Sequence, residues 1–68
     1  MKQNFILELD SPYSINHFKK LDEYDIKVIY SSNNICPEII IVEAVDEKLF
    51  NDLEFVLKYE LERKFHLI

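Results

Sequence analysis

The chain has 68 residues, of which 49% are hydrophobic, so the composition is that of a globular protein and not of a disordered one. Thirteen acidic residues against eight basic ones give a formal net charge of −5, which disfavours direct binding to nucleic-acid phosphates. Glycine is absent, which excludes glycine-dependent phosphate loops and dinucleotide fingerprints.

Residues 5–9 predict the first strand, because apolar and other side chains alternate along them. Phe5, Leu7 and Leu9 share one face, which we expect to meet helices. Ile6 lies on the opposite face. The strand should end at the following Asp-Ser-Pro sequence.

A short amphipathic helix is expected next, from Pro12 or Ser14 to about Glu23. Ser11 before the proline is one candidate N-cap, and Ser14 is the alternative. Apolar residues at a spacing of three predict its buried stripe: Ile15, Phe18 and Leu21.

Two further strands read as an antiparallel hairpin, over residues 26–30 and 38–45. Residues 31–34 form its turn, since asparagine tolerates the left-handed conformation that glycine would otherwise provide. The uninterrupted β-branched run 39–42 predicts a strand near the middle of the sheet, with both faces covered or nearly so.

The last element is expected to be an amphipathic helix capped by Asp46. Its apolar residues recur at three- and four-residue spacing: Phe50, Leu53, Leu57, Leu61 and Phe65. Two lengths are open. The helix continues to Phe65, or it stops near Glu60 and residues 64–68 form a fourth, edge strand.

Residues 1–68 are therefore expected to form a single α+β domain with the order β-α-β-β-α, with or without a short terminal strand. This is the ferredoxin-like split β-α-β pattern of a two-layer sandwich. We expect the first and third strands to be parallel neighbours, the second strand to lie at the edge, and both helices to cover one face.

The other face of the sheet should stay open and largely apolar. Ile6 and Ile29 point there, together with either Ile39 and Ile41 or the alternate set of the third strand. An aromatic pair on the outer side of the last helix extends the apolar surface. The candidate protein-interface residues are Ile6, Ile29, Ile39, Ile41, Phe55 and Tyr59.

Catalytic and metal sites are not predicted. Cys36 lacks an evident base, and His17 and His66 lack a supporting motif or close ligand spacing. Acidic residues around the first helix have the wrong spacing for a calcium loop. We expect neither an enzyme nor a cofactor.

The sequence favours a small non-enzymatic protein-binding module, such as a bacterial or phage inhibitor, adaptor or immunity-type protein. Self-association, most simply as a homodimer, would supply stability that a chain this short lacks. A variant is an acidic mimic that occupies a nucleic-acid groove. The alternatives are a ferredoxin-like metabolite-binding dimer and a protease pro-segment-like inhibitor.

Location is inferred from two features of the sequence. The lone Cys36 suits a reducing compartment. No apolar run approaches the roughly 18 residues that a membrane span needs, and Glu8 and Asp10 interrupt the first apolar segment. A cytoplasmic protein without membrane contact is therefore expected.

Overall fold

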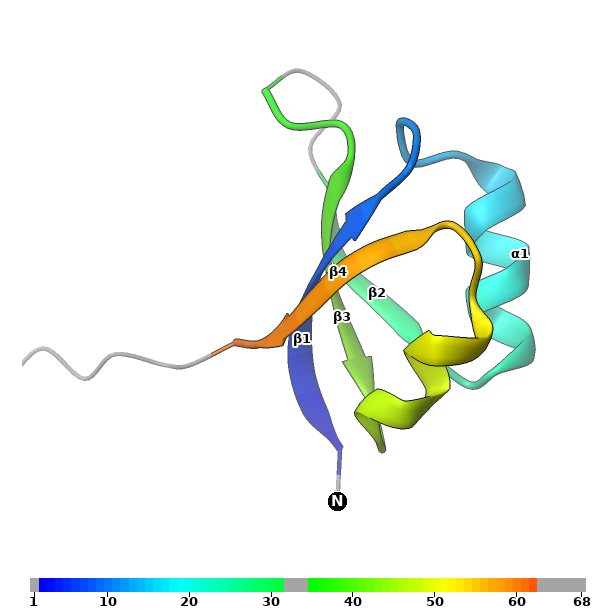
Figure 1. The fold of residues 1–68 in the computed structure, drawn as a ribbon, viewed down its shortest axis with the longest axis vertical. Helices are drawn as coiled ribbons and strands as arrows, with labels where there is room; N and C mark the ends of the chain where they lie inside the picture. The colour runs from blue at the N-terminus through cyan, green and yellow to red at the C-terminus, as the bar shows by residue number, and fades with distance from the viewer. Residues whose placement is uncertain (1, 32–34, 63–68) are drawn as a thin grey trace, which may run out of the picture.

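The structure is a computed structural model that describes residues 2–31 and 35–62. Along these residues the chain forms β1 (Gln3–Leu9), α1 (Ile15–Glu23), β2 (Lys27–Ser31), β3 (Ile39–Ala44), the 3-10 helix η1 (Glu47–Asp52) and β4 (Val56–Leu61). The strands make one sheet in the order β2-β3-β1-β4, and every pair of neighbours is antiparallel. Both α1 and η1 lie on the same side of this sheet (Figure 1). The small α+β class predicted from the sequence is confirmed.

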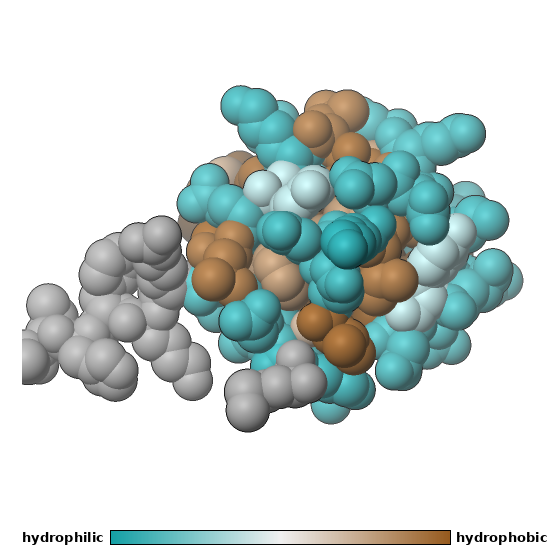
Figure 2. Space-filling view, turned by 60° about the horizontal axis from the view of Figure 1, so that its bottom comes forward, coloured by the Kyte–Doolittle hydropathy of each residue, from teal (hydrophilic) through white to brown (hydrophobic). Residues whose placement is uncertain are grey.

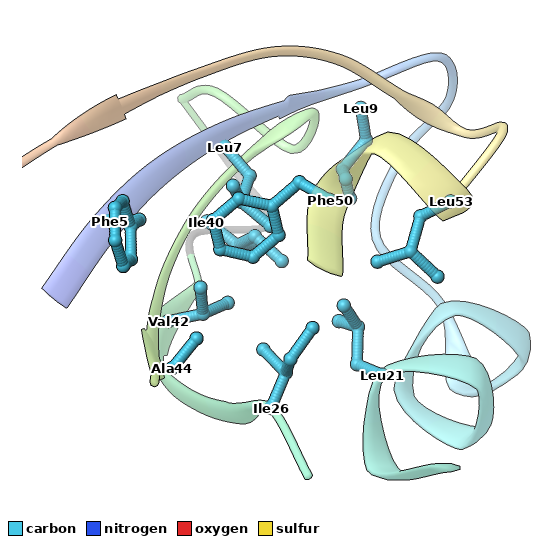
Figure 3. Close-up of a cluster of buried hydrophobic side chains, with 10 residues drawn as sticks. All are labelled: Phe5, Leu7, Leu9, Leu21, Ile26, Ile40, Val42, Ala44, Phe50 and Leu53. Atoms are coloured by element: carbon cyan, nitrogen blue, oxygen red, sulfur yellow. The ribbon is translucent and has the colours of Figure 1, made fainter. Parts of the chain in front are cut away.

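One face of the two central strands, β1 and β3, forms the floor of the core. Side chains from α1, η1 and the segments next to them pack against this face, as Figure 3 shows. Full burial of each large apolar side chain contributes about 1.5–3 kcal/mol of transfer free energy. The buried cluster comprises Phe5, Leu7, Leu9, Leu21, Ile26, Ile40, Val42, Ala44, Phe50 and Leu53.

The alternation in β3 settles which of its faces is covered. Ile40, Val42 and Ala44 are buried, whereas Ile39 and Ile41 are half-buried on the open face. In β1 the predicted core face is likewise confirmed. The β-branched run therefore lies in the middle of the sheet, but only one of its faces is covered by helices.

Helix α1 begins after Ser14, the second of the two predicted caps, and ends at Glu23 as expected. The amide of Ser14 donates a hydrogen bond to Nδ1 of His17 over 3.1 Å, so that His17 takes the place of the Glu or Gln found in a capping box. The prediction that the helix ends near residue 23 is confirmed.

The buried stripe of α1 differs from the predicted one. Leu21 is fully buried, but Ile15 and Phe18 are exposed and His17 is buried in their place. His17 and Leu21 are four residues apart and share a face, and that face points toward the sheet. The spacing of three between Ile15, Phe18 and Leu21 had predicted a buried face, but the side of α1 that carries Ile15 and Phe18 is turned away from the core.

The prediction of a long terminal helix was wrong. Residues 47–52 form η1, which Asp46 does cap, through a 2.9 Å hydrogen bond from the Lys48 amide to Oδ1, and residues 56–61 form β4. Leu53, Leu57 and Leu61 fit a helical repeat, but the alternating residues of 57–61 fit a strand as well. Pairing with β1 decides between them, because β1 would otherwise be left with an unpaired edge. The alternative strand at 64–68 lies outside the described residues, as do positions 32–34 of the predicted turn.

The complete ferredoxin-like order was wrong too, because η1 stands where a second α-helix was expected. The parallel arrangement of β1 and β3 was also wrong. Since α1 returns the chain to its starting end, β2 runs in the same direction as β1, and β3 lies between them and runs antiparallel to both. The edge position of β2 and the adjacency of β1 and β3 were predicted correctly.

Candidate functional site

The face of the sheet opposite α1 and η1 carries an apolar group that no helix covers in the described part of the chain. Ile6 of β1 lies directly opposite Ile41 of β3, and Ile41 lies opposite Tyr30 of β2. Directly opposed side chains in an antiparallel sheet are close enough to form one surface. We call this surface the open-face patch; it consists of Ile6, Ile29, Tyr30, Ile39 and Ile41.

The most accessible part of the open-face patch is on the edge strand β2. Tyr30 is 57% exposed and Ile29 is 49% exposed, while the isoleucines of β1 and β3 are half-buried. The pairing of β2 with β3 shifts between Val28 and Tyr30, so that Tyr30 and not Ile29 takes the position opposite Ile41. Strict alternation along the sequence places Tyr30 on the face opposite to Ile29, and it therefore missed Tyr30. The bulge that brings Tyr30 to the open face is not visible in the sequence pattern.

Charged residues border the open-face patch on several sides. Lys27 of β2 lies opposite Glu43 of β3, and Glu8 of β1 lies opposite Lys58 of β4. Opposite charges in such cross-strand positions contribute a few tenths to about 1 kcal/mol. An apolar centre with a charged border is the usual layout of a protein-binding surface.

Phe55 and Tyr59 do not lie on the outer face of a helix, as the sequence had predicted, but pack against buried residues of the chain. The Phe55 ring packs on the His17 imidazole with centroids 4.7 Å apart, and Tyr59 packs on Phe50 at 5.3 Å. Both are half-buried against the core of their own chain, and their rings pack on different partners. Their role in a protein interface stays a prediction. The aromatic pair expected on the outer side of a helix is absent, because Tyr59 is in β4 and Phe55 comes just before it.

A second exposed apolar area lies between α1 and the end of β2. Ile15 and Phe18 border a shallow hollow of about 430 Å³ that Tyr13, Ser14 and Ser31 complete. Partial burial raises the pKa of the Tyr13 hydroxyl above its usual value of 10.0. Figure 2 shows that exposed apolar side chains on one face of the molecule form separate groups among hydrophilic ones.

His17 lies in a cluster with the polar side chains of Asp10 and Ser11. Its Nε2 is 3.4 Å from the Ser11 hydroxyl and 3.7 Å from a carboxylate oxygen of Asp10. Its Nδ1 accepts the Ser14 amide proton, so the neutral ring carries its own proton on Nε2. A nitrogen that carries a proton cannot take one from Ser11, and the role that the geometry gives His17 is that of a helix cap.

Other chemical features of the described residues give no site. They contain no group of three or more His, Cys, Asp or Glu side chains placed to hold a metal ion. Cys36 is exposed and free of a disulfide. A helix long and apolar enough to cross a membrane is not found among the described residues.

Comparisons with protein-family models, with curated proteins and with solved structures gave no match for this chain.

Proposed function

We propose that this chain is a small non-enzymatic protein-binding module that contacts its partner through the open-face patch. The observation that carries the proposal is the uncovered sheet face, where Ile41 lies between Ile6 and Tyr30 in neighbouring strands. Contiguous apolar surface of this kind is a common feature of interaction sites.

The size of the chain supports the same proposal. A domain of about 60 residues buries only about 60% of the surface that its unfolded form exposes, so covering a further apolar face adds a large share to its stability. Tyr30 is a suitable anchor, because tyrosine offers a large contact area and is enriched among the residues that dominate binding energy.

The class of partner follows from the charge pattern. With a net charge of −5 the chain suits a partner whose contact surface is neutral or basic. An inhibitor, adaptor or immunity-type protein in the cytoplasm of a bacterium, encoded by the host or by a phage, remains our proposal for its biological role. Occupation of a basic nucleic-acid groove as an acidic mimic is a variant of it.

The test is affinity capture from a bacterial lysate, with the captured proteins identified by mass spectrometry and each candidate then purified and titrated. Tyr30→Asp places a charge on the most accessible part of the open-face patch, and Ile35→Asp is the matched control at a residue that is 84% exposed outside the strands. We expect the purified partner to bind the native chain and the Ile35→Asp variant alike, with Tyr30→Asp weaker by about tenfold or more.

Circular dichroism should show the same spectrum for all three chains, because both substituted side chains are exposed in the native fold. Equal affinity of Tyr30→Asp and the native chain for every partner would disprove a role for the open-face patch.

The metabolite-binding alternative depends on the hollow beside α1. Its lining combines the hydroxyls of Tyr13, Ser14 and Ser31 with the apolar surfaces of Ile15 and Phe18. A metabolite that raises the melting temperature of the native chain, but not that of a Phe18→Asp variant, would favour this alternative. The pro-segment alternative needs residues 64–68, which are not described.

A further inference from the structure

The outer edge of β4 presents backbone groups for which no strand partner exists among the described residues (Figure 1). The Glu62 amide donates a 2.9 Å hydrogen bond to the Asn4 carbonyl on the inner side, toward β1. Hydrogen-bonded positions alternate along an antiparallel ladder. Glu60 therefore also directs its backbone groups toward β1, while Tyr59 and Leu61 direct theirs outward.

The side chains on this edge follow an order that is nearly the same in both directions. Leu57 and Leu61 flank the segment and are 59% and 41% exposed. Lys58 and Glu60 lie inside them, and Tyr59 is at the centre. Reversing the direction of residues 57–61 exchanges only the two charges.

We propose that β4 pairs antiparallel with β4 of a second copy of this chain, about a two-fold axis that passes beside Tyr59. In this register Lys58 lies opposite Glu60 of the second copy, and Leu57 lies opposite Leu61 of the second copy. An isologous contact of this kind is the commonest form of homodimer interface. The proposal goes beyond the open-face patch and does not depend on it.

Charge selects this register over its neighbours. The nearest register on one side places Lys58 opposite Lys58 of the second copy. The nearest register on the other side places Glu60 opposite Glu60, and it keeps Lys58 opposite Glu62, so that only its central pair is repulsive. Like charges in direct cross-strand positions are destabilising, and opposite charges are stabilising. Charged side chains on an edge strand usually discourage pairing with another chain. Here Lys58 and Glu60 form only opposite-charge pairs in the proposed register, and each neighbouring register contains a like-charge pair.

The shape of the surface next to β4 also accommodates a second strand. A hollow of about 430 Å³ lies where η1 meets this edge, and its lining includes Phe50, Asn51 and Leu53 together with residues 56–60. In the proposed register the second copy brings its Leu61 opposite Leu57, at the border of this hollow. Its apolar side chain can therefore leave water on pairing.

Sedimentation equilibrium of the full chain over a range of concentrations tests the proposal. Lys58→Glu and Glu60→Lys each convert both cross-strand ion pairs into like-charged pairs. We expect each variant alone to dimerise about tenfold or more weakly than the native chain. An equimolar mixture of the two variants should recover dimers, because the charges are again opposite between unlike chains.

The matched control is Lys27→Glu, on the other edge strand. Lys27 lies opposite Glu43 as Lys58 lies opposite Glu8, so both substitutions have a similar cost within the chain. Lys27→Glu should leave dimerisation unchanged. A native chain that stays monomeric at every concentration, dimers that survive both single variants, or a mixture that stays monomeric would each overturn the proposal.

Recovery by mixing also shows that both variants are folded, since an unfolded chain could not restore the pairing. Failure of this experiment leaves the open-face patch untouched, because Tyr30 is on the opposite edge strand from β4.

Discussion

Asp25 shows how a single residue replaces glycine in this chain. Its φ of 59° lies in the left-handed region, and Asp25 follows Tyr24, the C-cap of α1. The amide of Ile26 donates to the Leu21 carbonyl at 2.9 Å, and the amide of Asp25 donates to the Asp22 carbonyl at 3.1 Å. These two bonds form a Schellman motif, and the apolar contact that accompanies it is made by Leu21 and Ile26 in the core.

Substitution at Asp25 should therefore change stability in a direction set by backbone conformation. Asp25→Gly should raise the free energy of unfolding by about 0.5–1 kcal/mol, because the left-handed conformation costs an L-residue about 1–2 kcal/mol and glycine nearly nothing. Asp25→Ala should lower it, and Asp25→Asn is the control with little effect. Urea denaturation measures all three, and a more stable alanine than glycine variant would contradict this account.

His17 makes two separable contributions to stability. Its Nδ1 satisfies the Ser14 amide, and its ring packs on Phe55 in a buried position. Loss of both in His17→Ala should cost about 2–3 kcal/mol.

His17→Gln keeps an acceptor that can reach the Ser14 amide but removes the ring, so it should lose only part of that free energy. Chemical denaturation of the two variants checks the order. If glutamine were as destabilising as alanine, the hydrogen bond to the Ser14 amide would contribute nothing.

At the scale of elements, the first four were predictable because local patterns and tertiary needs agree in them. The strand predicted at residues 5–9 corresponds to Gln3–Leu9 in the structure, and the predicted hairpin strands correspond to Lys27–Ser31 and Ile39–Ala44. Alternation in β1 and the β-branched run in β3 require no knowledge of distant partners. The buried side of α1 was less predictable, because His17 is buried while the more hydrophobic Ile15 and Phe18 are exposed.

Residues 47–61 could not be assigned from local patterns because the decisive interaction is with β1. Tyr59 lies opposite Leu7, which is more than fifty positions earlier in the sequence. Phe50 and Leu53 are buried in the observed 3-10 helix and next to it, as a longer helix would also have required, so their spacing did not discriminate. Only the need to pair the free side of β1 favours a strand at 56–61, and that need arises from the assembled sheet.

Phe50 should be the residue that holds η1 in place. Its ring meets Phe5 edge-on with centroids 5.0 Å apart and meets Tyr59 at 5.3 Å, and it is 1% exposed. Phe50→Ala should cost about 3–5 kcal/mol. This is a large fraction of the total expected for 68 residues at roughly 0.05–0.15 kcal/mol per residue.

Thermal denaturation followed by circular dichroism should therefore show Phe50→Ala largely unfolded or melting far below the native chain. The control is Asn51→Ala, because Asn51 is exposed in the same 3-10 helix. A small effect of Phe50→Ala would mean that η1 contributes little to the core.

At the scale of the whole molecule, the open face was predictable and its most accessible residue was not. Ile6, Ile39 and Ile41 follow from alternation once only one sheet face is covered. Tyr30 depends on the bulge in β2, and the edge of β4 depends on a strand that the sequence did not reveal. Phe55 and Tyr59 were chosen for a helix that does not form.

Tyr30 and the edge of β4 should act independently, because β2 and β4 are at opposite ends of the sheet order. Sites that are far apart and share no partner contribute additively to binding and stability. A two-fold axis that continues the sheet through β4 leaves both open faces on the same side, so each copy keeps its patch accessible after pairing.

Lys58→Glu should therefore abolish most of the dimer, while each copy still binds a partner through Tyr30 with an affinity reduced far less than by Tyr30→Asp, because Lys58 lies only at the border of the open-face patch. Tyr30→Asp should do the reverse, and the double variant should show the sum of both losses in free energy. Sedimentation equilibrium reports the first property, and calorimetric titration with the captured partner reports the second. If Tyr30→Asp also prevented dimerisation, the two copies would associate through their open faces, because Tyr30 has no place in a contact made by β4 alone.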